Sequence, residues 1–217
     1  MIYHVKKTDA GFDYKNGWDA PNGFAKAETL ELQHFMGDKP QHFPKVQARV
    51  LYDDKNIYVF FKVHDNYIRA VAVKTHDPVC RDSCVEFFFI PSENLADGYF
   101  NVEINCGGTM LLYHQTARGT NQRKAALDDC EKIRIKASLP KIVEPEIQQP
   151  TTWTLQYAID VEMLKKYTNV VKPAKGVKWL ANFYKCADNT SHPHWLTWNK
   201  VDLPKPDFHR PEFFGTL

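Results

Sequence analysis

Two glutamates each interrupt a short run of residues typical of a β-strand. Glu86 lies in "CVEFFFI" (84–90), and Glu103 lies in "YFNVEIN" (99–105). A buried carboxylate is costly unless a partner compensates it, so each is either paired with a nearby lysine or arginine or held for function. Two strand-borne carboxylates are also the acid and base of many glycosidases, whose carboxyl groups lie roughly 5–10 Å apart.

Side chains alternate between two faces in the strand expected at 99–105. Its polar face carries Tyr99, Asn101, Glu103 and Asn105. The other face carries Phe100, Val102, Ile104 and Cys106 and is typical of core. The polar row predicts a hydrogen-bonding surface for a ligand, and the alternative is an ordinary solvated strand face.

Histidines and tryptophans crowd into "SHPHWLTW" (191–198). His192 and His194 could chelate a metal if Asp188 or His209 supplied a third ligand. Alternatively, one tryptophan fills the end of the core while the other lies on the surface. In a third interpretation, Trp195 or Trp198 is a platform for a ligand, and the proline stiffens the loop and lowers the entropy lost on binding.

The elements that would position these residues are short β-type runs separated by turn residues. Ten are expected, at 29–35, 45–53, 56–65, 68–74, 84–90, 99–105, 110–116, 131–139, 152–160 and 177–186. One short helix is expected at 160–167 with Asp160 as N-cap, 138–150 is expected to be a long loop, and "PDFHRPEFFG" (206–215) a last strand. The pattern predicts an all-β fold, a single antiparallel β-sandwich of about ten or more strands.

Composition supports one domain over 1–217 and excludes several function classes. The apolar content of 43% can fill a core, so disorder is excluded. The 28 basic and 26 acidic residues are scattered, which gives no indication of nucleic acid as a partner. No apolar run is long enough to span a membrane. The start lacks a signal-peptide core, so the chain is cytoplasmic if complete and periplasmic or extracellular if a signal was removed.

Five cysteines cannot all pair with one another, and none is spaced as CxxC, which disfavours a zinc ribbon. Cys84, Cys106 and Cys186 lie in apolar runs and are interpreted as small buried side chains. Cys80 and Cys84 are close enough in sequence for a strained local disulfide in an oxidising compartment. No metal ligand set and no cofactor is predicted.

Five segments, in order, carry a resemblance to a known family. They are "ARVLYDDKNIYVFFKVHDNYI", "RDSCVEFFFIP", "YFNVEINCGGTMLL", "ANFYKC" and "PHWLTW" followed by "PDFHRPEFFG". The series resembles the family 9 carbohydrate-binding modules and their DOMON-like relatives, particularly stand-alone members from Bacteroidetes, from about residue 18 to the C-terminus. The resemblance implies a jelly-roll-like sandwich that binds sugar between two tryptophan rings.

That resemblance also assigns site residues. Glu86 matches the strand carboxylate, and Asn101, Glu103 and Asn105 match the polar row. Trp195 and Trp198 are the candidates for one ring, but Cys80 stands where the other is expected, which leaves Tyr99 or Tyr184 as substitutes. Arg81 and Arg210 are candidates for the rim, although arginines in such positions are more often ordinary surface or ion-pair residues. Some family members hold structural calcium, but no clear Asp-rich loop appears here.

The leading functional hypothesis is non-catalytic binding of a mono- or oligosaccharide, with carbohydrate-active enzymes as further partners. A glycosidase using Glu86 and Glu103 is the enzymatic alternative. A scaffold domain with a degenerate sugar site is a third, supported by Cys80. Haem, held in some DOMON-like domains by methionine and histidine, would require Met36 or Met110, and neither has a histidine beside it in sequence.

Overall fold

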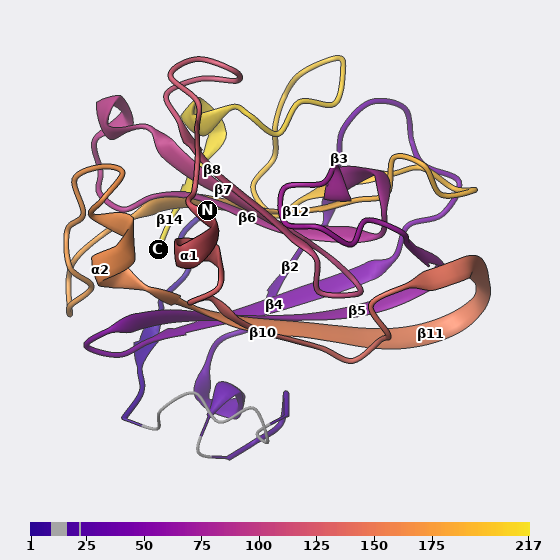
Figure 1. Cartoon of the computed structure of the whole chain (residues 1–217), viewed down its shortest axis with the longest axis horizontal. Coiled ribbons are helices and arrows are strands. Elements are labelled where there is room, and N and C mark those ends of the chain that lie inside the picture. The colour runs from indigo at the N-terminus through magenta and orange to yellow at the C-terminus, as the bar shows by residue number, and fades with distance from the viewer. Residues whose placement is uncertain (10–16, 22) are drawn as a thin grey trace.

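Two β-sheets lie face to face in the computed structural model, which describes residues 1–9, 17–21 and 23–217 (Figure 1). The six-stranded sheet runs β1-β4-β5-β11-β10, with β2 beside β4. Its strands are β1 (Lys6–Lys7), β2 (Leu30–Glu31), β4 (Lys45–Tyr52), β5 (Asn56–Ala70), β10 (Arg134–Ala137) and β11 (Val143–Asp160). Except for the parallel pair β1 and β4, its neighbours are antiparallel.

The eight-stranded sheet runs β3-β13-β12-β6-β7-β8-β9, with β14 beside β12, and is antiparallel throughout. Its strands are β3 (His34–Phe35), β6 (Cys84–Ile90), β7 (Tyr99–Asn105), β8 (Met110–Gln115), β9 (Arg123–Lys124), β12 (Leu180–Cys186), β13 (Trp195–Thr197) and β14 (Gly215–Thr216). The predicted antiparallel β-sandwich is therefore confirmed.

Helices are short. The α-helices are α1 (Leu127–Cys130) and α2 (Val161–Leu164), and the 3-10 turns are η1 (Phe24–Lys26), η2 (Val79–Arg81), η3 (Leu95–Asp97) and η4 (Pro211–Phe213). Asp160 caps α2 as predicted, because its carboxylate accepts a hydrogen bond from the Glu162 N–H at 2.8 Å. No helix in the described part of the chain is long and apolar enough to cross a membrane.

The main core fills the space between the sheets with the side chains that strand alternation predicts. β7 contributes Phe100, Val102 and Ile104, and β11 contributes Trp153 and Leu155. A second apolar cluster lies on the outer face of the eight-stranded sheet, where the C-terminal segment, yellow in Figure 1, passes over the strands. This outer cluster, which includes Cys84, Phe88, Tyr99 and Tyr184, supports the candidate site.

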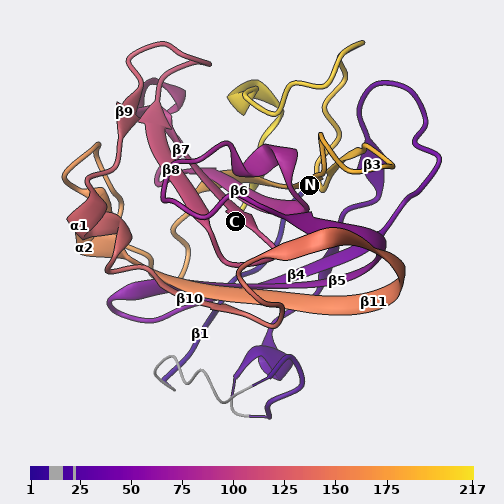
Figure 2. The same cartoon turned by 45° about the vertical axis from the view of Figure 1, so that its right-hand side comes forward.

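Several predicted boundaries were wrong. The two strands expected at 56–65 and 68–74 form one long β5, and the loop expected at 138–150 becomes the first half of β11 from Val143 onward. β5 and β11 run side by side along the lower sheet (Figure 2), with Ile147 paired with Ile68. This part of β11 is mostly exposed, so it lacks the apolar alternation by which a strand is recognised.

The other differences concern the ends of elements. The run 29–35 divides into β2 and β3, which belong to different sheets. The expected helix at 160–167 is one turn, and α1 was not predicted. The expected last strand at 206–215 is mainly irregular, with η4 beginning at Pro211, because proline cannot donate to a strand ladder.

Candidate functional site

A pocket of about 900 Å³ opens on the outer face of the eight-stranded sheet. Its sheet-derived lining includes Glu86 from β6, Glu103 from β7, Cys186 from β12 and Trp195 from β13. Loops complete the lining, namely residues 37–41, Cys80, Arg118, Asp188, Pro193 and residues 204–209. The strands thus provide the carboxylates, while segments far apart in sequence provide the walls.

Glu86 and Glu103 are direct partners in the antiparallel pair of β6 and β7. Both are buried, at 2% and 6% exposure, although both contact the pocket. Glu86 Oε1 accepts a hydrogen bond from the Cys186 thiol at 3.0 Å, and Glu103 Oε1 accepts one from Asn101 Nδ2 at 2.9 Å. Within the described residues neither carboxyl group forms an ion pair, although Lys185 lowers the pKa of Glu86 and Arg118 lowers that of Glu103 to a smaller extent than burial raises them.

This environment favours protonation of the pair. Burial raises the pKa of Glu86, and the neighbouring Glu103 raises it further. Burial likewise raises the pKa of Glu103 to about 7. Two adjacent carboxyl groups with raised pKa values hold a proton to higher pH than isolated ones do. They can therefore both donate hydrogen bonds to a ligand and accept them from it.

Trp195 contributes its indole ring to the pocket lining. Its ring is half-buried, and its Nε1–H donates to Asp188 Oδ1 at 2.8 Å, which fixes the orientation of the indole. Burial raises the pKa of Asp188, and the indole hydrogen bond opposes that shift. A ring held in this way loses little conformational freedom when a flat apolar surface stacks on it.

Trp198 lies on the other side of the sheet. It is 5% exposed, belongs to the core between the sheets and packs edge-on against Phe183 at a centroid distance of 5.7 Å. Because the chain is extended from Trp195 to Thr197, residues three apart face opposite sides. Trp198 is therefore a core residue, whereas Trp195 lies nearer the surface and lines the pocket.

The polar row behind the pocket forms a hydrogen-bond network. Asn101 Oδ1 accepts from Gln115 Nε2 at 2.9 Å while its own amide donates to Glu103. Tyr99 is fully buried, and its hydroxyl lies 2.9 Å from His209 Nδ1. Asn101 and Tyr99 therefore support residues that line the pocket without lining it themselves.

The other sequence candidates lie outside the pocket lining. Asn105 donates to Asp82 Oδ2 at 2.8 Å and accepts from the Thr109 N–H at 2.8 Å, which stabilises a turn. The Tyr184 hydroxyl donates to the Phe208 carbonyl at 3.1 Å, and its ring stacks on Phe208. Arg210 forms an ion pair with Asp207 at 2.9 Å.

Arg81 is exposed and lies at the end of η2, also outside the lining. Cys80, which takes the position of the expected second ring, does line the pocket.

Loops supply the residues that sequence reasoning missed. Phe208 adds aromatic surface, as does His209, which the sequence had indicated only as a possible metal ligand, and Arg118 adds a guanidinium that is 66% exposed and 3.3 Å from Asp207. Gln115 had one available signal, since it is the strand partner of Tyr99 and faces the same side. The loop residues had none, because their approach depends on the path of the whole C-terminal segment.

The two histidines considered as metal ligands make other contacts. His194 is fully buried, with Nε2 2.8 Å from Lys185 Nζ and Nδ1 2.9 Å from the His192 carbonyl. The His192 ring stacks on Tyr67 at 3.6 Å. All five cysteines are free, so the disulfide considered for Cys80 and Cys84 is not formed.

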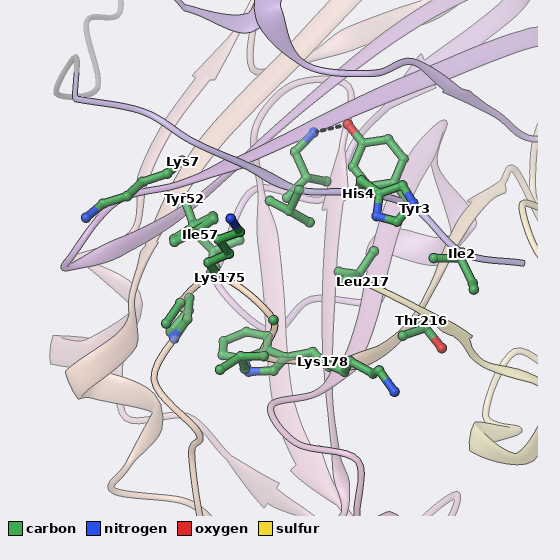
Figure 3. Close-up of a pocket in the computed structure, with 17 residues that line it drawn as sticks. Ile2, Tyr3, His4, Lys7, Tyr52, Ile57, Lys175, Lys178, Thr216 and Leu217 are labelled. Atoms are coloured by element: carbon green, nitrogen blue, oxygen red, sulfur yellow. Dashed lines mark hydrogen bonds between the residues drawn. The ribbon is translucent and has the colours of Figure 1, made fainter.

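A second pocket, of about 720 Å³, lies where the N-terminal segment, the C-terminus and residues 173–179 meet β4 and β5 (Figure 3). Figure 3 shows Lys7, Lys175 and Lys178 around an apolar interior that includes Ile57 and Leu217. Its described lining contains no carboxylate or amide side chain. We therefore place the candidate site at the first pocket, where polar and aromatic groups converge.

Comparison with known proteins agrees with this architecture. A candidate carbohydrate-binding protein from Bacteroides uniformis ATCC 8492 superposes with a TM-score of 0.85 at 29% identity, covering 98% of this chain and 95% of that one. No curated protein matches the chain.

Two structures of a family 9 module from Caldicellulosiruptor kristjanssonii share the fold at 12% identity. The complex with glucose gives a TM-score of 0.61 and covers 97% of this chain and 93% of that one. The complex with cellotriose gives 0.65 and covers 99% and 91%. The sequence model of carbohydrate-binding family 9 matches residues 21–217, nearly the whole chain. The chain therefore belongs to carbohydrate-binding family 9.

Proposed function

We propose that this protein binds a mono- or oligosaccharide in the pocket lined by Glu86, Glu103 and Trp195. The observation that carries the proposal is the convergence of two buried carboxyl groups and an oriented indole in one open pocket. A pyranose ring has an apolar face that stacks on an indole and hydroxyls that both donate and accept hydrogen bonds. Glucose and cellotriose, present in the structures of the related modules, are the first ligands to test.

The pocket offers one tryptophan ring where the resemblance implies two. Cys80 lines the wall at the position of the second ring, so the sugar would stack on Trp195 alone, with Phe208 and His209 as the remaining aromatic contacts. A single fixed ring gives weaker binding than a clamp and tolerates more variation in the sugar. We therefore expect modest affinity and a preference set mainly by hydroxyl contacts to Glu86 and Glu103.

The test is calorimetric titration with glucose and cellotriose, together with tryptophan fluorescence, in wild-type protein and two matched variants. Trp195→Ala should weaken binding about tenfold or more, because a stacking anchor is lost. Trp198→Ala should leave the sugar affinity of the folded protein unchanged. It should lower the free energy of unfolding by roughly 3–5 kcal/mol, because the side chain of a buried tryptophan is lost from the core.

Two outcomes would contradict this proposal. The first is no saturable binding to these sugars or to a broad glycan array. The second is release of new reducing ends from cellotriose that disappears in both Glu86→Gln and Glu103→Gln, since that result would establish a glycosidase instead.

A further inference from the structure

Two cysteines and a glutamate converge beneath the pocket. Cys84 and Glu86 are two residues apart on β6 and share its outer face, and Cys186 on β12 is the direct strand partner of Cys84. One ligand atom from each of the three lies within 4.8 Å of the other two. The Cys186 Sγ lies 3.0 Å from Glu86 Oε1. In the described residues, this is the one group of three or more metal-ligating side chains found so close together.

The chemistry of the group suits a thiophilic divalent cation. Tetrahedral Zn²⁺ binds thiolate sulfur at about 2.3 Å and carboxylate oxygen at about 2.0–2.2 Å, so two ligand atoms on one ion lie roughly 3.5–3.8 Å apart. Ligand atoms already within 4.8 Å need only small side-chain movements to reach that geometry. Three protein ligands would leave a fourth position for water or another donor, as in open zinc sites.

The pocket gives access to this group of ligands. Glu86 and Cys186 line the pocket, so an ion has an entry path from solvent. Glu103 faces Glu86 across the strand pair, and Asp188 lies in the same pocket, so a bound dication would favour the ionised form of these carboxyl groups. On binding, each thiol would release its proton to solvent, because the thiolate is the ligand.

We propose that Cys84, Glu86 and Cys186 form a binding site for a thiophilic divalent cation, with Zn²⁺ as the expected ion, at the floor of the pocket. This site goes beyond carbohydrate binding and requires no sugar. Sequence spacing concealed it because one thiol comes from β6 and the other from β12, and only the antiparallel register makes them neighbours.

The experiment is titration of the fully reduced, sugar-free protein with Co²⁺, which reports thiolate ligands by charge-transfer absorption and tetrahedral geometry by visible bands. Wild-type protein should give saturable bands at one ion per chain, and Zn²⁺ should abolish them. Cys84→Ser and Cys186→Ser should each lose about half of the charge-transfer intensity and bind at least tenfold more weakly. The double variant should lose the charge-transfer band.

Cys106→Ser is the matched control. It makes the same replacement at a fully buried cysteine that packs in the core between the sheets, and its bands should equal those of wild type. Circular dichroism and thermal melts of the metal-free variants establish that each is folded. Absence of thiolate charge transfer in saturated wild-type protein would overturn the proposal without reference to any variant. The proposal would also be overturned if Cys106→Ser and Cys186→Ser lost the same amount of charge-transfer absorption.

Discussion

Two groups of buried ionisable residues lie on opposite faces of the eight-stranded sheet, and they differ in how their charges are compensated. On the inner side, Lys185 is fully buried with Nζ 3.6 Å from Asp65 Oδ2, 2.8 Å from His194 Nε2 and 2.9 Å from the Cys186 carbonyl. On the outer side, Glu86 and Glu103 face each other, and neither forms an ion pair in the described part of the chain. The inner charges are paired with each other and stabilise the fold, whereas the outer carboxyl groups remain available to bind a ligand in the pocket.

The inner group also joins the two sheets. Asp65 belongs to β5 of the six-stranded sheet and Lys185 to β12 of the eight-stranded sheet. Asp65 Oδ1 lies 2.7 Å from His42 Nε2 and accepts the Asn66 N–H at 2.8 Å. The Lys185 charge and these hydrogen bonds outweigh burial and lower the pKa of Asp65. Asp65 has these partners and a lowered pKa, whereas Glu86 and Glu103 lack such partners among the described residues and have raised pKa values.

The largest expected effect comes from removing the cation of the inner group. Lys185→Met should lower the free energy of unfolding by about 3–5 kcal/mol, because Asp65 would remain as a buried charge without its partner. Chemical denaturation measures the change. The double variant Lys185→Met with Asp65→Asn should recover part of the loss. A loss below about 1 kcal/mol in the single variant would show that the inner pair is not the compensated group described here.

The second largest expected effect is a loss of stability in acid, caused by the buried His194. Burial and the adjacent Lys185 lower the pKa of His194 to about 3, so the folded state resists protonation that the unfolded chain accepts near its ordinary value of 6.5. Stability is therefore complete above pH 6.5 and falls as the pH drops toward 3. The loss should be about 2 kcal/mol between pH 6 and pH 4.

Denaturation curves at several pH values, compared with those of His194→Gln, test this expectation. The variant cannot titrate at this position, so its stability should vary less over the same range. His209, whose pKa burial lowers to about 4, contributes in the same direction and should remain in both proteins. Identical slopes for wild type and variant would contradict the assignment to His194.

The smallest effect on stability, and of opposite sign, should follow from changing the outer pair. Glu103→Gln should raise the free energy of unfolding by about 1 kcal/mol at pH 8 in the presence of a chelator, because it removes one of two buried like charges. Burial raises the pKa of Glu103 to about 7, so the unfavourable ionised form predominates only above that pH. The gain should disappear at pH 5.

Sugar affinity should fall in the same variant, which separates stability from function. Calorimetry with the best sugar ligand is expected to show binding about tenfold weaker or worse. A variant that is both less stable and unchanged in sugar affinity would show that Glu103 is a structural residue like Asp65.

The local sequence pattern was sufficient to predict much of the fold and part of the candidate site. The alternation in "YFNVEIN" placed Phe100 and Val102 in the core and Glu103 on the outer face. The residues 195–197 form a strand, and their spacing alone would have separated Trp195 from Trp198 had the segment not been interpreted as a loop. The polar first half of β11 was missed because its pairing with β5, and not an apolar face, makes it a strand.

Long-range contacts were beyond the reach of sequence reasoning. The ion pair of Asp65 and Lys185 joins two sheets, and no periodicity links one strand to another across a sandwich. The approach of Phe208, His209 and Arg118 to the pocket depends on loops that lack a repeating pattern. The polar row was recognised by residue type, but only the structure separates Glu103, which lines the pocket, from Asn105, which stabilises a turn.

The position of β12 has a consequence for motion. It lies between β6 and β13, with Lys185 locked to the opposite sheet and Cys186 at the pocket floor on the next residue. A movement of the floor would therefore break a buried ion pair, whereas residues 37–41 and 204–209 lie outside the strands. In hydrogen exchange, the β12 amides should be among the slowest in the molecule, and a ligand should slow exchange mainly in those two loops. Ligand binding would then order the two loops, while the strands beneath the pocket keep their positions.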